Sequence, residues 1–336
     1  MQKDWYRIHK TWRTILLMPF SWLFCVISQI RKFILQKSAY KSKLPVIIVG
    51  NITVGGTGKT PVVEAVCQFL QIEGYHPALI TRGYGVKIKN FPLIVNGKTS
   101  PEQCGDEPFM LNNLLQNIPV IVSPKRIESI KYIEQHLSEV DVIVSDDGLQ
   151  HYAIRRDVEI VVVDGVRMFG NGLCMPAGPL RETTKRLETV DIIIINGKSF
   201  CECVKDRQYT MKLTPQNFIN LKTEISYTID DFFKKEGLSC FAIAGIGNPR
   251  RFFSTLISLG LNVVEYPFQD HHSFQENDFK FLINDNLPII MTHKDAVKCQ
   301  KFARKNWYYL QIKPEIDEKF FKFLKDKLSL LEQGKE

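Results

Sequence analysis

The sequence predicts an α/β fold in which a mostly parallel sheet carries helices on both faces, with a smaller C-terminal α/β domain and an N-terminal apolar helix. Three observations lead to this prediction. Apolar runs alternate with polar or helical stretches from residue 44 to about 200, which is the pattern of parallel βαβ units. A glycine-rich loop follows the first of these runs, and a nearly unbroken apolar segment precedes it at 15–30.

The composition is that of a globular protein of about two domains. The chain has 336 residues, of which 44% are hydrophobic, and a formal net charge of +8, which favours anionic partners such as a nucleotide or an acidic membrane surface. The basic residues are dispersed and gather most clearly around the apolar helix, so we expect no nucleic-acid partner. The eight cysteines form no Cys-x-x-Cys pair and lack the histidine spacing of a zinc site, as is typical of a reducing cytosol.

The first 37 residues are expected to contain a membrane-associated helix. The apolar segment 15–30 is shorter than the roughly 20 residues that span a bilayer, and no cleavage site of a secretory signal follows it. Basic residues flank it on both sides, namely Lys3, Arg7, Lys10, Arg13, Arg31, Lys32 and Lys37. These features favour a helix that lies in the membrane interface, where basic side chains meet anionic headgroups. A helix packed on the protein core is the alternative.

The loop after the first predicted strand, 46–50, is interpreted as a phosphate-binding loop of the P-loop NTPase type. It contains Gly55, Gly56, Thr57 and Gly58. Its glycines let successive backbone N–H groups point at one phosphate, and the following helix adds the positive end of its dipole. Lys59 would reach the β- and γ-phosphates, and Thr60 would bind Mg²⁺. Thr53 stands where the usual pattern has glycine, so the match is imperfect.

We expect the P-loop domain to extend over 38–204. Further strands are predicted at 76–81, 119–123, 140–145, 158–163 and 190–195, each ending in a polar or glycine-bearing loop. In an open α/β sheet, ligands bind outside the carboxyl ends of the strands. The side chains expected at that edge are those of Arg82, Asp146, Asp147, Asp164 and Asn196.

Two adjacent carboxylates, Asp146 and Asp147, follow the strand at 140–145 and are the favoured Mg²⁺ ligands, because two carboxylates suit a cation better than one. Asp164 is the alternative, and an acidic strand end can also be only a helix cap or a turn former. Further polar loops lie at 82–85, 105–108, 150–151 and 178–182. A carboxylate in such a loop could deprotonate an attacking hydroxyl, although any one of them alone is better explained as a solvated turn.

The composition changes after residue 204. Residues 205–237 are expected to form a linker that contains a β-ribbon with strands at 209–213 and 218–225. The smaller domain, 238–336, has strands predicted at 239–245, 262–267, 288–292 and 307–312, and helices predicted at 250–259 and 315–331. Asp270 and His271 follow one of these strands, where a loop could meet the crevice of the first domain. A metal site there is not expected, since the adjacent histidines have one carboxylate and no cysteine nearby.

As a set, these motifs resemble one family, the tetraacyldisaccharide 4′-kinases of lipid A biosynthesis. The resemblance rests on blocks that are ordered along nearly the whole chain: 49–61 (Val-Gly-Asn-Ile-Thr-Val-Gly-Gly-Thr-Gly-Lys-Thr-Pro), 81–85, 105–108, 146–151, 178–182, 244–249, 270–271 and 292–298. It includes Thr53, so the departure from the usual loop pattern fits the family.

The resemblance implies transfer of the γ-phosphate of ATP, with Mg²⁺, to the 4′-hydroxyl of a tetraacylated glucosamine disaccharide 1-phosphate. The reaction would take place at the cytoplasmic face of the bacterial inner membrane, and no obligate protein partner is implied. Asp106 would be the catalytic base, assisted across the cleft by His271, although the neighbouring His272 leaves open which imidazole faces the site. Lys59 and Thr60 would act on the phosphates and Mg²⁺.

The resemblance also implies a metal site formed by Thr60, Asp146 and Asp147, with Glu107 close by. Weaker candidates for positioning the substrate or the phosphates are Arg82, Tyr84, Gln150, His151, Arg181 and Glu182.

A membrane-associated P-loop ATPase that acts as a nucleotide switch on a protein partner is the alternative function. Partitioning ATPases carry an extra lysine before the Gly-Gly of the loop, where this chain has Val54. A GTPase would have a base-reading motif of the Asn-Lys-x-Asp type, and residues 292–295 (Thr-His-Lys-Asp) have the wrong spacing. Both features favour the kinase.

Overall fold

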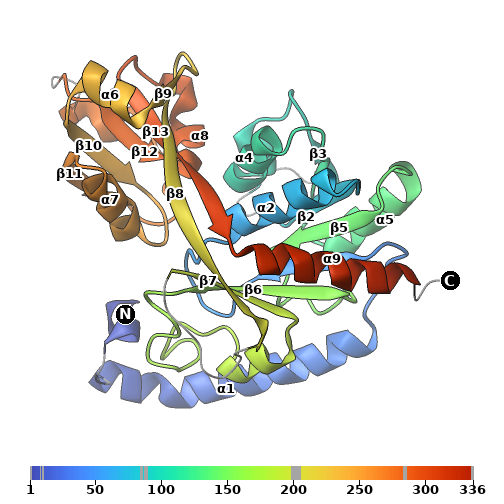
Figure 1. Ribbon diagram of the computed structural model, residues 1–336. Coiled ribbons are helices and arrows are strands. Elements are labelled where there is room, and N and C mark those ends of the chain that lie inside the picture. The colour runs from blue at the N-terminus through green and yellow to red at the C-terminus, as the bar shows by residue number, and fades with distance from the viewer. Residues whose placement is uncertain are drawn as a thin grey trace. The chain divides into compact units, whose positions relative to one another are not determined.

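The computed structural model describes residues 2–7, 9, 11–83, 86, 90–197, 206–282 and 286–333 (Figure 1). It confirms the predicted fold class, because mostly parallel strands alternate with helices. The chain divides into two compact units. Unit 1 comprises Met1–Lys98, Leu111–Lys212 and Glu315–Glu336, and unit 2 comprises Thr99–Met110 and Leu213–Pro314.

The sheet of unit 1 has the strand order β8-β7-β6-β1-β5-β2-β4-β3. Its strands are β1 (Val46–Gly50), β2 (Pro77–Thr81), β3 (Leu93–Val95), β4 (Val120–Val122), β5 (Val142–Asp146), β6 (Val158–Asp164), β7 (Ile192–Asn196) and the first part of β8 (Gln208–Asn220). All neighbours pair in parallel except β3 and β4. Strands β1, β2, β5, β6 and β7 are buried along their whole length, which explains why they appear in the sequence as continuous Val- and Ile-rich runs.

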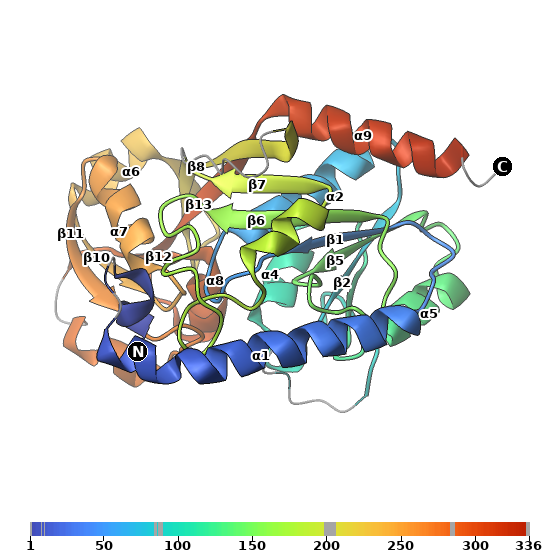
Figure 2. The ribbon, with the colours of Figure 1, turned by 90° about the horizontal axis from the view of Figure 1, so that it is seen from below.

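Helices cover both faces of this sheet (Figure 2). On one face, α5 (Arg126–His136) and α1 (Trp12–Lys37) contribute to the same apolar cluster, α5 through Ile130 and Ile133 and α1 through Phe24. On the other face, α2 (Lys59–Ile72) contacts β1, β2 and β5. Phe321 of α9 (Glu318–Gln333) lies against Phe69 of α2. A 3₁₀ helix, Thr184–Thr189, lies before β7.

Helix α1 is longer than the apolar segment that predicts it. It begins after Thr11, whose hydroxyl accepts a hydrogen bond from the Thr14 N–H. The Ser21 hydroxyl donates to the Cys174 carbonyl at 2.7 Å, which fixes the helix on unit 1. By length and composition, α1 could cross a membrane. A short 3₁₀ helix, Gln2–Tyr6, precedes it.

Unit 2 has the strand order β11-β10-β12-β13-β8, and β9 pairs antiparallel with β8. Its own strands are β9 (Ser226–Thr228), β10 (Ser239–Ala244), β11 (Asn262–Pro267), β12 (Ile289–Thr292) and most of β13 (Trp307–Ile316), and its helices are α3 (Pro101–Cys104), the first part of α4 (Asp106–Leu114), α6 (Ile229–Glu236), α7 (Pro249–Ser258) and α8 (His293–Cys299). Two 3₁₀ helices, Glu276–Leu282 and Gln300–Phe302, complete the described elements. Phenylalanine side chains form much of two apolar clusters in this unit.

The region expected to be a β-ribbon is different in the structure. Residues 209–213 and the first residues of 218–225 belong to one continuous strand, β8, and β9 pairs with its far end. Helix α6 follows and was not expected within 205–237. It begins at the cap Thr228, whose hydroxyl accepts a hydrogen bond from the Asp231 N–H, and buries Phe232. Five of its eight residues are charged, so the short apolar face of this amphipathic helix is hard to recognise in the sequence.

The two units also divide the chain differently from the expected boundaries. The segment Thr99–Met110 belongs to unit 2, although it lies within the expected P-loop domain 38–204. The final helix α9 belongs to unit 1, although it lies within the expected domain 238–336. Its buried side chains explain this placement, since Phe320 of α9 contacts Tyr209 of β8.

Candidate active site

The phosphate loop connects β1 to α2 and is held by two asparagines. The Asn51 amide donates to the Gly55 carbonyl and to the Thr57 hydroxyl, each at 3.4 Å. The Asn196 amide, at the end of β7, donates to the Thr57 carbonyl at 3.0 Å. Gly58 has φ = 95° at the point where the loop enters α2. Its backbone conformation is one that glycine adopts readily.

Thr53 does not disturb the loop, because this part of the chain is paired with the 178–182 segment. Thr53 forms a β-bridge with Leu180. The Val54 N–H donates to the Pro179 carbonyl at 2.8 Å, and the Arg181 N–H donates to the Ile52 carbonyl at 2.7 Å. Thr53 therefore has extended backbone and needs no glycine. The same pairing brings Arg181 and Glu182 beside the phosphate loop.

Arg167 is a contact of the loop that the sequence motifs did not identify. Its guanidinium pairs with the buried Asp164 carboxylate at 2.8 Å and donates to the Gly56 carbonyl. Asp164, the alternative metal ligand, is thus engaged by Arg167 and by the backbone N–H of Val166. These contacts lower the pKa of Asp164 although burial acts in the opposite direction.

Asp147 lies beside Lys59 at the carboxyl edge of the sheet. The Lys59 ammonium is 3.4 Å from the Asp147 carboxylate, and the Arg181 guanidinium is 3.2 Å from it. Burial alone would raise the pKa of Asp147, but Lys59, Arg181 and Arg126 hold it well below its usual range. Asp147 also has φ = 45°, a left-handed backbone that aspartate tolerates better than most residues. Asp146 is buried at the end of β5.

Arg126 is a second residue that sequence reasoning missed. It is 4% exposed at the start of α5 and donates to the carbonyls of Asp146 and Asp147 at 2.6 and 3.0 Å. It follows the carboxyl end of β4, so the rule that ligands bind at the carboxyl edge of the sheet could have identified it. Its contacts fix the backbone that carries both carboxylates.

Gln150 and Glu182 form a hydrogen-bonded pair next to Arg181. The Gln150 amide donates to the Glu182 carboxylate and to the Asn51 carbonyl, both at 2.9 Å. Tyr152 donates a short hydrogen bond to Glu182. Burial and several nearby arginines lower the pKa of His151 to about 4, so its imidazole is neutral at physiological pH. Among the described residues, its Nε2 atom is one of the buried side-chain atoms without a hydrogen-bond partner.

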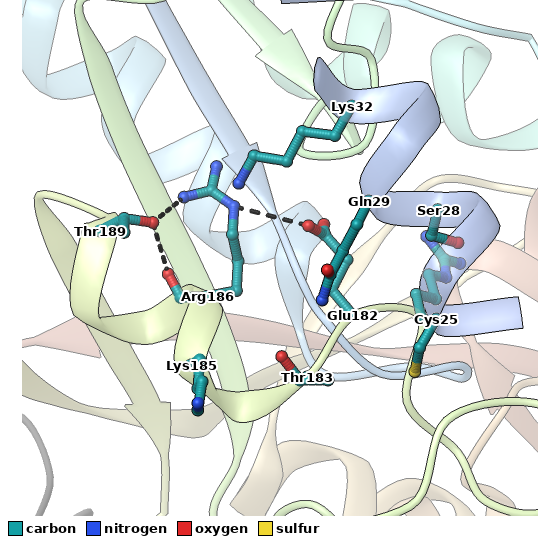
Figure 3. A pocket seen from close by; sticks show the side chains of 10 residues that line it. Cys25, Ser28, Gln29, Lys32, Glu182, Thr183, Lys185, Arg186 and Thr189 are labelled. Carbon is teal, nitrogen blue, oxygen red and sulfur yellow. Dashed lines mark hydrogen bonds and ion pairs between the residues drawn. The ribbon is translucent and has the colours of Figure 1, made fainter. Parts of the chain in front are cut away.

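A cavity of about 200 Å³ lies in unit 1 between α1 and the chain that follows Arg181 (Figure 3). Its lining residues are Cys25, Ser28, Gln29, Lys32, Arg181, Glu182, Thr183, Lys185, Arg186 and Thr189. Lys32 of α1 and Arg186 extend toward each other, with the Glu182 carboxylate beside them. Burial and Arg186 lower the pKa of Lys32, although Glu182 opposes this. Four basic side chains and one carboxylate give the cavity a positive charge.

Asp106 and Glu107 lie in unit 2, at the start of α4. The Lys294 ammonium donates to Glu107 at 2.8 Å, and the Lys298 ammonium is 3.9 Å from Asp106. Burial raises the pKa of Asp106 above its ordinary value, although Lys298, Lys294 and His271 act in the opposite direction. Burial alone would lower the pKa of Lys294, but Glu107 raises it.

His271 also lies in unit 2, so the structure groups it with Asp106, and the expected division between two domains does not hold. The Asp278 carboxylate accepts a hydrogen bond from the His272 Nε2 atom at 2.9 Å, and the His272 ring packs against Phe268 and Phe274. His271 has φ = 62° and lies 3.9 Å from the Asp270 carboxylate. It is the imidazole that acts electrostatically on Asp106.

Arg82 and Tyr84 are the remaining candidates for positioning the substrate or the phosphates. Arg82 is exposed after β2 and acts electrostatically on Arg126 and His151. Tyr84 lies outside the described residues.

The residues of unit 1 suit a magnesium ion bound together with nucleotide phosphates. Mg²⁺ takes oxygen ligands and is usually held by one or two carboxylates plus substrate phosphates. Asp146 and Asp147 supply carboxylates at the end of β5, and Thr60 supplies a hydroxyl in the first turn of α2. The low pKa of Asp147 keeps its carboxylate ionised, as a cation ligand must be. In the described part of the chain, no three His, Cys, Asp or Glu residues form a metal cluster.

Comparisons with known proteins identify related chains. Residues 13–329 match the family described as tetraacyldisaccharide-1-P 4′-kinase. The tetraacyldisaccharide 4′-kinase of Francisella philomiragia is 46% identical over 316 residues, which cover 92% of this chain and 97% of that protein. The enzyme of the same name from Francisella tularensis subsp. novicida is 45% identical over 325 residues, or 94% and 99% of the two chains.

A similar solved structure is that of the "apo" form of LpxK from Aquifex aeolicus in complex with ATP. It aligns with a TM-score of 0.78 and 28% sequence identity, covering 94% of this chain and 99% of that one.

Proposed function

Because the chain belongs to the tetraacyldisaccharide-1-phosphate 4′-kinase family, we propose a division of roles among its own residues in that reaction. It is an ATP-dependent kinase that transfers the γ-phosphate of ATP to the 4′-hydroxyl of tetraacyldisaccharide 1-phosphate in lipid A biosynthesis. The observation that carries the nucleotide role is the ion pair between Lys59, at the end of the phosphate loop, and Asp147, after β5.

In this proposal, the loop Gly55–Gly56–Thr57–Gly58 binds the phosphates of ATP through its backbone N–H groups, and Lys59 neutralises charge that develops on the transferred group. Phosphoryl transfer requires mainly alignment and charge stabilisation. Arg167 and the two asparagines support the loop, since they contact Gly56, Gly55 and Thr57. A preorganised loop loses less conformational entropy when it binds the nucleotide.

Asp106 is proposed as the general base. The 4′-oxygen forms a bond to the γ-phosphorus, the bond from that phosphorus to the β,γ-bridging oxygen breaks, and ADP leaves with the bond's electron pair. The hydroxyl proton passes to the Asp106 carboxylate. The raised pKa of Asp106 supports this role, because a carboxylate of ordinary pKa is a weak base. His271 is proposed to assist it, since it acts electrostatically on Asp106.

Mg²⁺ is proposed to be held by Thr60, Asp146 and Asp147, where it would neutralise charge on the phosphates. Arg126 supports this assignment by fixing the backbone of both aspartates. Glu107 is a further proposed ligand, and its carboxylate is paired with Lys294.

The remaining candidates are proposed to position the lipid headgroup. Gln150 contacts both Arg181 and Glu182, and Arg181 and Glu182 line the basic cavity beside α1. His151 follows Gln150 in the chain. A positive cavity suits an anionic disaccharide phosphate. The unpartnered Nε2 atom of His151 supports a hydrogen bond to the substrate. Arg82 and Tyr84 are also proposed to position the lipid headgroup.

We propose that α1 attaches the enzyme to the cytoplasmic face of the inner membrane by lying in the interface. One side of the helix is fixed to unit 1 by Ser21 and by the packing of Phe24. The exposed apolar side chains of α1 are Trp12, Ile15, Leu16, Phe20, Trp22, Leu23, Ile27, Ile30, Phe33 and Ile34. An apolar surface of this size on a helix with basic ends suits a membrane interface.

The proposed base is tested in mixed micelles with Mg²⁺, γ-labelled ATP and the tetraacyldisaccharide 1-phosphate. The native enzyme is expected to transfer label to the lipid. An Asp106→Ala variant is expected to lose at least about 100-fold in kcat, as is typical for general-base removal, while its affinity for ATP stays close to native. Near-native turnover in that variant would exclude Asp106 as the base.

A further inference from the structure

We propose that Lys298 is a positioning residue of this kinase: it holds the Asp106 carboxylate in the orientation that receives the proton of the acceptor hydroxyl. The inference rests on the proposed role of Asp106. It assigns a function to the 292–298 segment, whose residues the mechanism above does not otherwise use.

Lys298 lies in the last turn of α8, and its side chain is only 7% exposed. Its ammonium donates to the Asp295 carboxylate at 3.1 Å and lies 3.9 Å from the Asp106 carboxylate. It also lies 5.5 Å from the centre of the Phe274 ring. A buried ammonium with these neighbours has few alternative positions, so it presents a fixed positive charge to Asp106.

The position of Lys298 is fixed by Asp295, which is completely buried. One Asp295 oxygen accepts the Gly245 N–H at 2.9 Å and the Thr292 hydroxyl at 2.7 Å. Thr292 in turn accepts the Asp295 N–H at 3.2 Å and caps α8. The network thus ties the lysine to the end of β10 and to the start of its own helix.

Gly245 is what allows this close approach. A Cβ atom there would lie 3.2 Å from the second oxygen of Asp295 and 3.2 Å from the Phe274 ring. A side chain would therefore press on both groups that surround the Lys298 ammonium. This geometry gives a physical reason for the glycine at the first position after β10.

The Lys298 ammonium faces two carboxylates, those of Asp295 and Asp106. Asp295 already has backbone and hydroxyl donors, and the same ammonium faces Asp106. One helical turn earlier, Lys294 pairs with Glu107 at 2.8 Å. Two lysines four residues apart on α8 thus face two consecutive carboxylates, and residues with this spacing share one face of a helix. These two lysines orient the beginning of α4 and also neutralise the charge of its two carboxylates.

The test is a double-mutant cycle between Lys298 and Asp106, measured with the full chain in the micelle assay. Lys298→Met is expected to lower kcat by about 10- to 100-fold, the scale of a misplaced catalytic group, with the KM values for ATP and lipid within about threefold of native. In an Asp106→Asn background, the same replacement is expected to change kcat by less than about threefold, because residues that act as a unit are not additive. Lys298→Arg is expected to restore part of the lost kcat.

A second variant separates positioning from folding. Removing the lysine alone leaves the buried Asp295 charge uncompensated, which can destabilise the unit. The double variant Asp295→Asn with Lys298→Met removes both charges and is expected to remain folded, by its thermal midpoint, with the same loss of kcat. Lys301→Met is the matched control, because Lys301 is 69% exposed and pairs with an exposed Glu102; its kcat is expected to be native.

Native kcat in the folded Lys298 variants would overturn the inference. The inference would also be overturned if Lys298→Met lowered kcat by the same factor in the native enzyme and in the Asp106→Asn variant, because Lys298 would then act independently of Asp106. Native kcat in Asp106→Asn alone would instead refute the proposed base.

Discussion

Gly58 is the residue at which the phosphate loop depends most clearly on glycine. It has φ = 95°, and a Cβ atom there would lie 2.4 Å from the Asn196 Nδ2 atom. A Gly58→Ala change therefore strains the backbone and displaces the amide that holds the Thr57 carbonyl. We expect ATP affinity to fall by at least about 10-fold, as a loss of roughly 1.4 kcal/mol implies.

Titration calorimetry with a non-hydrolysable ATP analogue measures this loss. Gly97→Ala is the control, because a Cβ atom at Gly97 would meet nothing within 4 Å and its backbone is not left-handed. Native affinity in the Gly58→Ala variant would show that the loop relaxes without cost.

The sequence could identify the residues of the site that belong to one local motif, but not those that act on a motif from elsewhere. Lys59 and Asp147 follow adjacent strands, so the rule for the carboxyl edge of a sheet places them together, as the structure has them. Arg167 and Lys298 contact segments far away in the chain. A lone arginine or lysine carries no periodicity that reports such a contact, so only the folded structure reveals it.

Helix α9 provides the clearest case of an element whose type could be predicted but whose place could not. Its amphipathic pattern indicates a helix with an apolar face. The pattern does not indicate which part of the protein that face packs against. In the structure, Phe320, Leu324 and Leu328 are buried within unit 1. The sequence also failed to predict that β8 is one continuous strand. Most of its 13 residues are only partly buried, so apolar and polar residues alternate weakly along it.

We expect Leu324→Ala to destabilise unit 1 by about 2–5 kcal/mol, because it creates a cavity in a buried helix face. Thermal unfolding monitored with and without bound ATP measures the effect on the nucleotide-binding unit. Leu330→Ala is the matched control, since Leu330 lies on the same helix and is 64% exposed; its effect should stay within about 0.5 kcal/mol. Equal effects of the two changes would contradict the assignment of α9 to the core of unit 1.

The exposed apolar side chains of helix α1 allow a test of membrane attachment. Trp12 and Trp22 are 70% and 71% exposed on this helix. Replacing both with serine removes two large apolar groups from the proposed membrane contact, and we expect binding to anionic vesicles to weaken by at least about 10-fold. Vesicle sedimentation measures it. Leu330→Ser removes an exposed apolar side chain outside α1 and should leave binding unchanged; an unchanged double tryptophan variant would argue against the interfacial helix.

At the scale of the whole molecule, the chain crosses between units more often than its local patterns suggest. The segment Thr99–Met110 leaves unit 1 to join unit 2, where Asp106 and Glu107 meet the lysines of α8. The strands on either side of this segment are predictable from their apolar runs, but the excursion depends on ion pairs with residues near position 300. The expected domain boundaries did not assign Thr99–Met110 to unit 2, because a boundary drawn from composition assumes that each domain is one continuous stretch of the chain.

Both units also carry a histidine that folding keeps neutral, which links the stability of the protein to pH. Burial lowers the pKa of His293 to about 4 in unit 2, where its ring stacks on Tyr309, and His151 is lowered to about 4 in unit 1. An unfolded histidine has a pKa of about 6.5, so between about pH 6.5 and 4 the unfolded chain binds protons that the folded chain does not. Stability is therefore fully present above about pH 6.5 and falls as the pH is lowered, by about 1–2 kcal/mol per histidine at pH 5.

The His293 contribution can be isolated with His293→Phe, which keeps an aromatic ring against Tyr309 but cannot titrate. We expect the difference in thermal midpoint between pH 7.5 and pH 5 to shrink in this variant, because one of the groups that take up a proton on unfolding is gone. His9→Gln, at an exposed position near the N-terminus, should leave that difference unchanged. If His293→Phe loses as much stability between the two pH values as the native chain, the imidazole is not held neutral by burial, and the acid sensitivity must arise from other groups.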